Sequence, residues 1–193
     1  MSALYREVFN PITNQLSSII RTSDGANIPL DVGNTDYAAY LTWVAAGNTP
    51  DPDPNYTIDA VRASVWQKIK EQRDSRKSGG VFVDSQWIHT DDSSRIQWLG
   101  IKDTARDNIT AGGKMTDVIQ MMGQNLMWKT LDNTFVAVTN QLAFDVVAAT
   151  KNLDAILFAQ AETKRAAVYA MTDPASYDTT TGWNKTYAES VAS

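Results

Sequence analysis

Alternating apolar and polar positions near the N-terminus predict a small antiparallel sheet. Strand-like runs cover residues 4–9, 16–22 and 27–30. Asn10-Pro11 ends the first run, because proline fixes φ and removes a hydrogen-bond donor. Gly25 supplies the positive φ that a tight hairpin turn needs, and Pro29 favours a sheet edge for the third run. We therefore expect a three-stranded meander.

Apolar residues at spacings of three and four predict helices over most of the remaining chain. The expected stretches are residues 35–45, 58–77, 94–111 and a long helix that continues from residue 140 without Gly or Pro until Pro174. Their expected N-caps are Asn34 or Thr35, then Thr57, Ser94 and Thr139. Gln97 completes a capping box with Ser94. The apolar pattern weakens at Gln160 and Lys164, which predicts that the last turns of the long helix project from the body.

Shorter elements are expected between these helices. The helix that begins at Ser94 should turn Ile96, Leu99 and Ile109 inward, and a short helix is expected over residues 116–122. Two hairpins are expected, one from residues 81–83 and 87–89, the other from residues 127–130 and 135–138. The predicted fold class is therefore α+β. It combines a small N-terminal β-meander plus helix with a mainly helical domain that carries two short β-hairpins and a long C-terminal helix.

Three prolines at alternate positions, Pro50, Pro52 and Pro54, separate the N-terminal elements from the later helices. Residues 50–56 can neither continue a helix nor pair centrally in a sheet, so we interpret them as a semi-extended Pro/Asp linker. The predicted organisation is an N-terminal module over 1–49, the linker over 50–56 and a helical domain over 57–171. A polar tail follows over 172–193, expected to be disordered or ordered by docking onto another molecule.

Composition narrows the classes of chemistry. The chain has 193 residues, 43% hydrophobic content, a net charge of −5, no cysteine and one histidine. Such a composition is globular and excludes disulfides, thiol nucleophiles and cysteine-ligated zinc. No apolar run approaches the length needed to cross a bilayer, and no basic start leads into an apolar run, so neither membrane insertion nor a signal peptide is expected. The acidic balance argues against a nucleic-acid partner.

Each candidate catalytic or ligand-binding motif lacks a residue that its chemistry requires. Asp51-Pro52-Asp53-Pro54-Asn55 resembles the start of a calcium loop, but Tyr56 occupies the obligatory glycine position. Gly112-Gly113-Lys114 resembles the end of a phosphate loop, but Met115 replaces the hydroxyl residue. His89 precedes two aspartates, but nothing in the pattern places a nucleophile beside it. We expect no enzyme activity, no catalytic residue, no cofactor and no metal ion.

Apolar side chains at exposed places are the remaining candidates for function. The meander offers Tyr5, Val8, Phe9 and Ile20 as partner-interface residues, with strand pairing through its exposed edges. Trp183 and Tyr187 are isolated aromatic residues in the polar tail. Trp183 alone among the six tryptophans lacks a predicted local core to join. These six residues are the expected interface.

Two stretches resemble known bacteriophage sequences. Residues 28–31, the segment Asn34-Thr35-Asp36-Tyr37-Ala38-Ala39-Tyr40-Leu41-Thr42-Trp43 and Gly47-Asn48-Thr49-Pro50 resemble an N-terminal module of tailed-bacteriophage structural proteins. Residues from about Ile58 to Met171 resemble a domain of unknown function common in phage tail and tail-fibre gene neighbourhoods. The matching features of this second stretch are Ile69 to Arg73-Asp74, Gly80-Val81, Met127-Trp128 with its aspartate turn, and Val138-Thr139.

The resemblance implies a non-enzymatic virion component associated with the phage tail, made in the bacterial cytoplasm. We expect an adaptor or attachment protein that joins tail fibres or baseplate parts, binds other tail or fibre proteins and forms a homo-oligomer. The alternative is a tail-fibre assembly chaperone that is absent from the mature virion. A small envelope-degrading hydrolase is a third reading.

Overall fold

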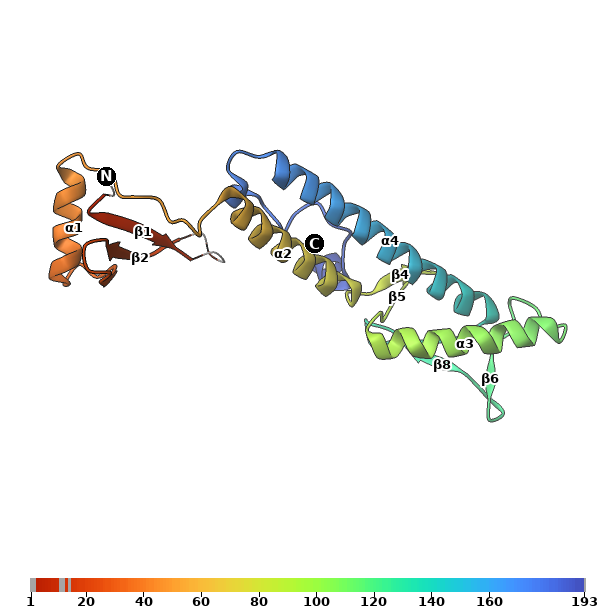
Figure 1. The fold of residues 1–193 in the computed structure, drawn as a ribbon. Helices are drawn as coiled ribbons and strands as arrows, with labels where there is room; N and C mark the ends of the chain where they lie inside the picture. Colours follow the sequence, from red (N-terminus) through yellow and green to blue (C-terminus); the bar gives the residue numbers. More distant parts are fainter. Residues whose placement is uncertain (1–2, 11–12, 14, 193) are drawn as a thin grey trace. The chain divides into compact units, whose positions relative to one another are not determined.

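The computed structural model describes residues 3–10, 13 and 15–192 and confirms the α+β class (Figure 1). The chain forms two compact units. The first consists of the residues up to Lys68 together with 166–178, and the second of residues 69–165 and 179–193. The division falls inside helices α2 (Ile58–Lys77) and α4 (Asn140–Ala170). Within the residues described, no helix is both long and apolar enough to span a bilayer.

The first unit contains the expected meander. Strands β1 (Tyr5–Phe9), β2 (Leu16–Arg21) and β3 (Asn27–Pro29) pair antiparallel in the order β1-β2-β3. Gly25 in the β2–β3 turn has a φ of 72°, which an L side chain rarely adopts. The register shifts between Val8 and Phe9, where a bulge is present.

Helix α1 (Thr35–Ala45) provides the layer that covers one face of this sheet. The Asn34 side chain accepts hydrogen bonds from the backbone N–H groups of Asp36 and Tyr37, which confirms one of the two expected caps. The unit's buried cluster joins residues of all three strands and α1, namely Tyr5, Ile19, Ile28 and Tyr40. The Tyr40 hydroxyl donates to Glu7 at 2.8 Å. Burial, aided by this hydrogen bond, raises the pKa of Tyr40.

The segment expected as a linker is extended and lies along the outer edge of β1. Asp51 donates its N–H to Tyr5 O at 2.9 Å and accepts from Glu7 N at 3.3 Å. The Asp53 carboxylate accepts from Phe9 N at 3.1 Å. The expectation of a free edge at β1 is therefore wrong. The prolines that prevent central pairing allow this short edge pairing, because each lacks only its own N–H.

The two longest helices begin where their caps predict. The Thr57 hydroxyl accepts from Ala60 N at 3.1 Å and the Thr139 hydroxyl from Leu142 N at 3.0 Å. In the sequence of α4, spacings of four and three from Leu142 predict a buried stripe that ends at Ile156. The observed stripe extends further and includes Leu153, Leu157, Ala161, Lys164 and Val168, and Ile156 is exposed instead of buried. Lys164 is only 8% exposed, so the expectation that the last turns project uncovered is wrong.

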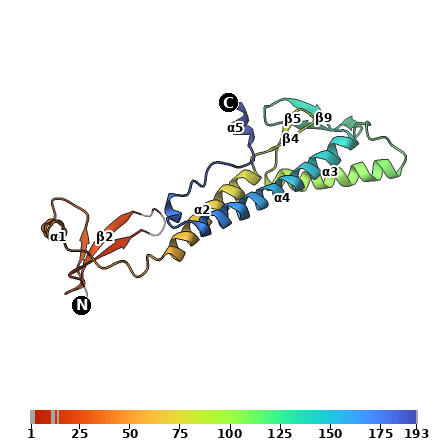
Figure 2. The ribbon, with the colours of Figure 1, turned by 90° about the horizontal axis from the view of Figure 1, so that it is seen from above.

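In the second unit, α3 (Asp92–Thr110) runs beside the first half of α4 in both views (Figures 1 and 2). Its N-cap is Asp91, whose side chain accepts from Ser94 N, so the prediction of Ser94 as the cap is wrong. Its buried residues are Ser94, Trp98 and Ala105. Ile96 is 70% and Leu99 is 55% exposed, against expectation. The large Trp98 ring decides which face turns inward, because it removes more apolar area from water.

Three two-stranded hairpins complete the second unit. They are β4 (Val81–Val83) with β5 (Gln86–Ile88), β6 (Gln120–Met121) with β7 (Gln124–Asn125), and β8 (Met127–Lys129) with β9 (Phe135–Ala137). The first and third were predicted. The β6–β7 hairpin replaces the helix expected over residues 116–122. Its turn residues Met122 and Gly123 have φ values of 54° and 77°, which a right-handed helix excludes.

Candidate partner-binding surfaces

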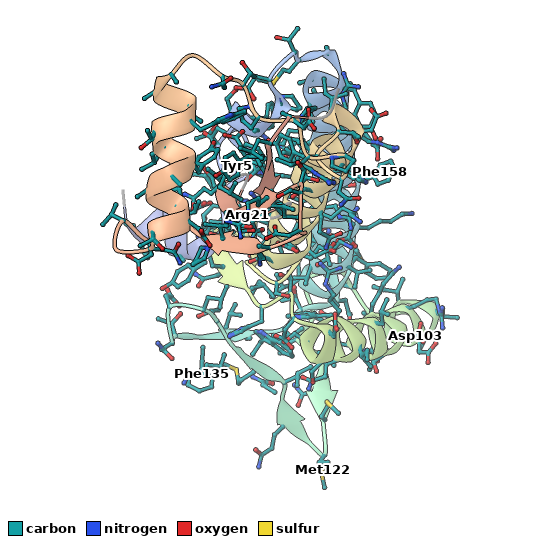
Figure 3. The ribbon with its side chains drawn as sticks, turned by 60° about the vertical axis from the view of Figure 1, so that its left-hand side comes forward. Tyr5, Arg21, Asp103, Met122, Phe135 and Phe158 are labelled. Carbon is teal, nitrogen blue, oxygen red and sulfur yellow. The ribbon has the colours of Figure 1, made fainter. Side chains whose placement is uncertain are left out.

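The meander candidates divide between the two faces of the sheet. Tyr5 is buried, and its ring meets those of Tyr40 and Trp43 edge-on at 5.3 and 5.2 Å. Phe9 stacks on Tyr56 with ring centroids 4.6 Å apart. Figure 3 shows Tyr5 near Arg21, its partner in the register. These two candidates therefore pack inside the first unit.

Val8 and Ile20 lie at the strand positions that alternate with those of the buried residues Tyr5 and Ile19. Val8 pairs with Ser18 and Ile20 pairs with Arg6, whereas buried Ile19 pairs with Glu7. Because successive side chains of a strand point to opposite faces, Val8 and Ile20 lie on the face away from α1. Both are half-buried. Of the four meander candidates, these two remain available for a partner.

The C-terminal candidates pack within the second unit. Trp183 is partly buried against the same cluster as Trp98 and Leu157, so the expectation that it lacks a local core is wrong. Its Nε1 donates to Thr179 O at 2.8 Å, and Lys164 Nζ lies 5.0 Å from its ring centroid. Tyr187 contacts Trp87 with ring centroids 5.9 Å apart. Sequence spacing could not show this core, because it comes from a distant part of the chain.

An ion pair anchors this C-terminal segment. Arg76 donates from Nη1 and Nη2 to the two carboxylate oxygens of Glu189, at 2.8 and 2.7 Å. Glu189 lies on α5 (Tyr187–Val191) and also completes a capping box with Thr186. The hydrogen bonds from Arg76, followed by that from Thr186 N, lower the pKa of Glu189 to about 2. The carboxylate therefore stays charged over a wide pH range.

A groove of about 800 Å³ opens in the second unit between α3 and the segment that carries β6, β7 and β8. Its walls are mainly apolar. The α3 side contributes Gly100 and Ile101, and the other side contributes residues 119, 121 and 126–128. His89, Ser94 and Lys129 also line it. Sequence reasoning missed this groove because the β6–β7 hairpin was interpreted as a helix.

The groove brings the single histidine to the same surface as a serine. Ser94 donates its hydroxyl to Asp91 Oδ2 at 2.6 Å and its N–H to Asp91 Oδ1 at 3.0 Å. These bonds, the hydroxyl first, lower the pKa of Asp91, and nearby His89 adds a smaller effect. A serine nucleophile needs a base that accepts its proton, whereas here the hydroxyl proton points at the helix cap. The arrangement stabilises the start of α3.

Exposed apolar side chains lie on the hairpins beside the groove, and two of them, Met121 and Met127, line it. We call Met121, Met122, Met127 and Phe135 the apolar rim; all four are exposed, and Met122 is completely so. Figure 3 shows Met122 at the free end of its hairpin and Phe135 on the outside of the unit. Among the residues that the structure describes, no cluster of three or more His, Asp or Glu side chains could hold a metal ion. The surface chemistry of this region is that of apolar contact.

Together the fold and these surfaces define a mixed α+β protein with a grooved, partly apolar second unit. The model of a family described as "Domain of unknown function (DUF4376)" matches residues 60–181, and the chain belongs to this family. The match covers more than half of the chain, and its residues 60–171 coincide with the second stretch whose resemblance was noted from sequence. No curated protein and no solved structure matches the chain.

Proposed function

We propose that the chain is a non-enzymatic structural protein of a bacteriophage virion, an adaptor in the tail that joins fibres or baseplate parts. The proposal combines the resemblance of residues 28–50 to a module of phage structural proteins with the apolar surface of the second unit. The protein is made in the host cytoplasm and is built into the tail as several copies, next to other tail or fibre proteins.

The observation that carries this proposal is the apolar rim beside the groove. Exposed large apolar side chains that gather on one region are typical of protein–protein interaction sites. The rim and groove together offer methionine, phenylalanine and tryptophan side chains, which form anchors at many interfaces. Val8 and Ile20 on the sheet of the first unit provide a second, smaller surface of the same kind.

Quantitative mass spectrometry of purified virions tests the proposal. The particles come from the phage whose genome encodes the chain, and the chain is compared with a known tail subunit in the same sample. We expect a fixed whole-number ratio to that subunit after extensive washing. A chain that is abundant in infected cells but missing from washed particles contradicts an adaptor role.

The alternative function is a tail-fibre assembly chaperone. The flexible methionine side chains of the rim favour it, because such surfaces adapt to partners that bind and leave. A chaperone would co-purify with fibre protein from infected cells and be absent from virions. The third reading, an envelope hydrolase, predicts cleavage of host polysaccharide or peptidoglycan by the purified chain, and we expect none.

A further inference from the structure

We propose that the groove between α3 and β8 binds a peptide segment of a partner protein in which aliphatic or methionine side chains adjoin a carboxylate. This inference rests on the proposed role in protein–protein contact and names the chemistry of the partner at that surface. It is argued from four features of the groove, namely the open space at Gly100, the exposed Lys129, an unpaired donor in the wall and the methionine side chains.

Open space for a side chain from a partner exists at Gly100. This glycine lies within α3 and lines the groove, and a Cβ built on it would meet no atom within 4 Å. Its backbone is helical, so the glycine is not required by a positive φ. Glycine in a helix costs about 1 kcal/mol relative to alanine, and no described residue comes close enough to this position to require glycine there. An incoming side chain can use the space.

An exposed lysine, Lys129, supplies positive charge at the groove. No acidic side chain is among the described residues that line the groove. His89 also lines it, but the Asp91 carboxylate lies close to this histidine. The chain as a whole carries a net charge of −5, so a lysine without an acidic neighbour in the lining runs against its general composition. A carboxylate on the partner complements Lys129.

An unpaired hydrogen-bond donor lies in the wall. Trp128 lines the groove, and its buried Nε1 has no acceptor in the described part of the chain. A buried donor without a partner costs about 1 to 3 kcal/mol. Because Nε1 is buried, a carbonyl or carboxylate oxygen of a peptide could accept this hydrogen bond only if the Trp128 ring turned toward the groove, and a purely apolar partner could not accept it at all.

Methionine side chains complete the apolar walls. Met121 and Met127 are both exposed and both line the groove. Methionine is unbranched and polarizable, so it packs against aliphatic side chains of different shapes. The groove is thus suited to an amphipathic segment whose apolar side chains enter between α3 and β8 while its carboxylate lies near Lys129.

Fluorescence anisotropy with labelled synthetic peptides tests this inference on the full-length protein. The probe is a short peptide that alternates leucine and methionine with aspartate, and its comparison peptide has lysine in place of aspartate. We expect the acidic peptide to bind at least about tenfold more tightly than the lysine peptide. Equal affinities, or no binding of the acidic peptide, would overturn the inference.

Two variants locate the binding. Gly100→Leu fills the groove and favours the helix, so it should weaken acidic-peptide binding about tenfold or more without loss of stability. Lys129→Glu should invert the preference between the two peptides. Asp107→Leu is the matched control on α3, because it adds the same side chain at an exposed position outside the groove lining, and it should bind as the unmodified protein does.

Other outcomes separate this inference from the proposed function. If Gly100→Leu binds the acidic peptide normally, the groove is not the site. If sedimentation shows self-association that Gly100→Leu abolishes while no peptide binds, the occupant is a second copy and the inference fails. Peptide binding that depends on Gly100 and Lys129, together with absence of the chain from virions, would retain the groove chemistry and reject the adaptor role.

Discussion

Gly80 lies where backbone conformation and packing both exclude a side chain. Its φ is +91°, and an added Cβ would meet Leu131 Cδ1 at 2.5 Å and Trp87 Cε3 at 3.2 Å. Its N–H donates to the buried Thr90 hydroxyl at 2.9 Å. The turn that follows α2 is thus fixed by a position that only glycine satisfies without strain.

Replacement of Gly80 by alanine should therefore destabilise the second unit more than the same change at Gly112. Gly112 has a similar φ of +92° but open space around its Cβ position. We expect Gly112→Ala to cost about 1 kcal/mol for the backbone conformation alone, and Gly80→Ala about 1 to 2 kcal/mol more for the overlap. Urea unfolding measures both. Equal costs would show that the surroundings of Gly80 relax freely.

Glu189 gives the C-terminal segment a dependence on pH. Its pKa is lowered to about 2 in the folded chain, so its contribution to docking is fully present above its ordinary pKa and is lost as the pH falls towards 2. We expect the Tyr187 amide, which donates to Gly79 O, to shift by NMR between about pH 5 and pH 2. In the Glu189→Gln variant, the C-terminal segment should bind the rest of the second unit less firmly at neutral pH, and the Tyr187 amide should no longer titrate in this range.

Glu162→Gln is the control for that experiment. Glu162 pairs with Arg165 at 3.6 Å on an exposed part of α4 and interacts more weakly with Arg73, so the same chemical change removes weak surface electrostatic contacts away from Glu189. The Tyr187 titration should be unchanged in this variant. Persistence of the full titration in Glu189→Gln would assign it to another group.

At the scale of the element, the capping-box pattern in the sequence of α3 predicts the wrong residue as the N-cap. The sequence offers Ser94 with Gln97 as a capping box, but Asp91 and Asp92 precede it. The chain between β5 and α3 reaches its extended conformation at Asp91, where φ is −62° and ψ is 161°. The helix therefore begins earlier, and the Ser94 N–H donates a hydrogen bond to the side chain of the N-cap residue Asp91.

Asp91→Ala should cost the second unit about 1 to 2 kcal/mol, because the backbone and hydroxyl of Ser94 both lose their acceptor. Asp92→Ala, in the exposed first turn, should cost only a few tenths of a kcal/mol. Thermal or urea unfolding gives both values. If Ser94→Ala proves more costly than Asp91→Ala, the capping assignment is wrong.

At the scale of the whole molecule, the two units have separate buried clusters. The first cluster centres on Ile19 and Tyr40, and the second includes Trp98, Val146 and Leu153. Because no described residue belongs to both of these clusters, a cavity made in one should leave the apolar packing of the other intact.

Ile19→Ala tests this independence. Ile19 is fully buried, and its truncation should cost about 2 to 4 kcal/mol. Hydrogen exchange measured by mass spectrometry should show lost protection in β1 to β3 and α1, with α3 and the hairpins unchanged. Leu153→Ala is the matched control and should give the reverse pattern. Simultaneous loss of protection in both units would show that they unfold together.

Sequence alone determined the elements whose signals act within a few residues. The caps at Asn34, Thr57 and Thr139 and the turns of the β4–β5 and β8–β9 hairpins follow from hydrogen bonds and φ preferences that need no distant partner. The positions of β1 to β3, α1, α2 and α4 were predictable for this reason.

Only the tertiary structure decided which faces are covered. Trp98 rather than Ile96 turns inward on α3, Asp51 and Asp53 occupy the β1 edge, and Trp183 joins a core built far away in the chain. The groove depends on a hairpin whose turn is Met122-Gly123. In the sequence this turn resembles the end of a helix, because glycine commonly follows a helix C-terminus. Burial is a property of partners separated by tens of residues, and hydrophobic pattern alone does not specify which partners meet.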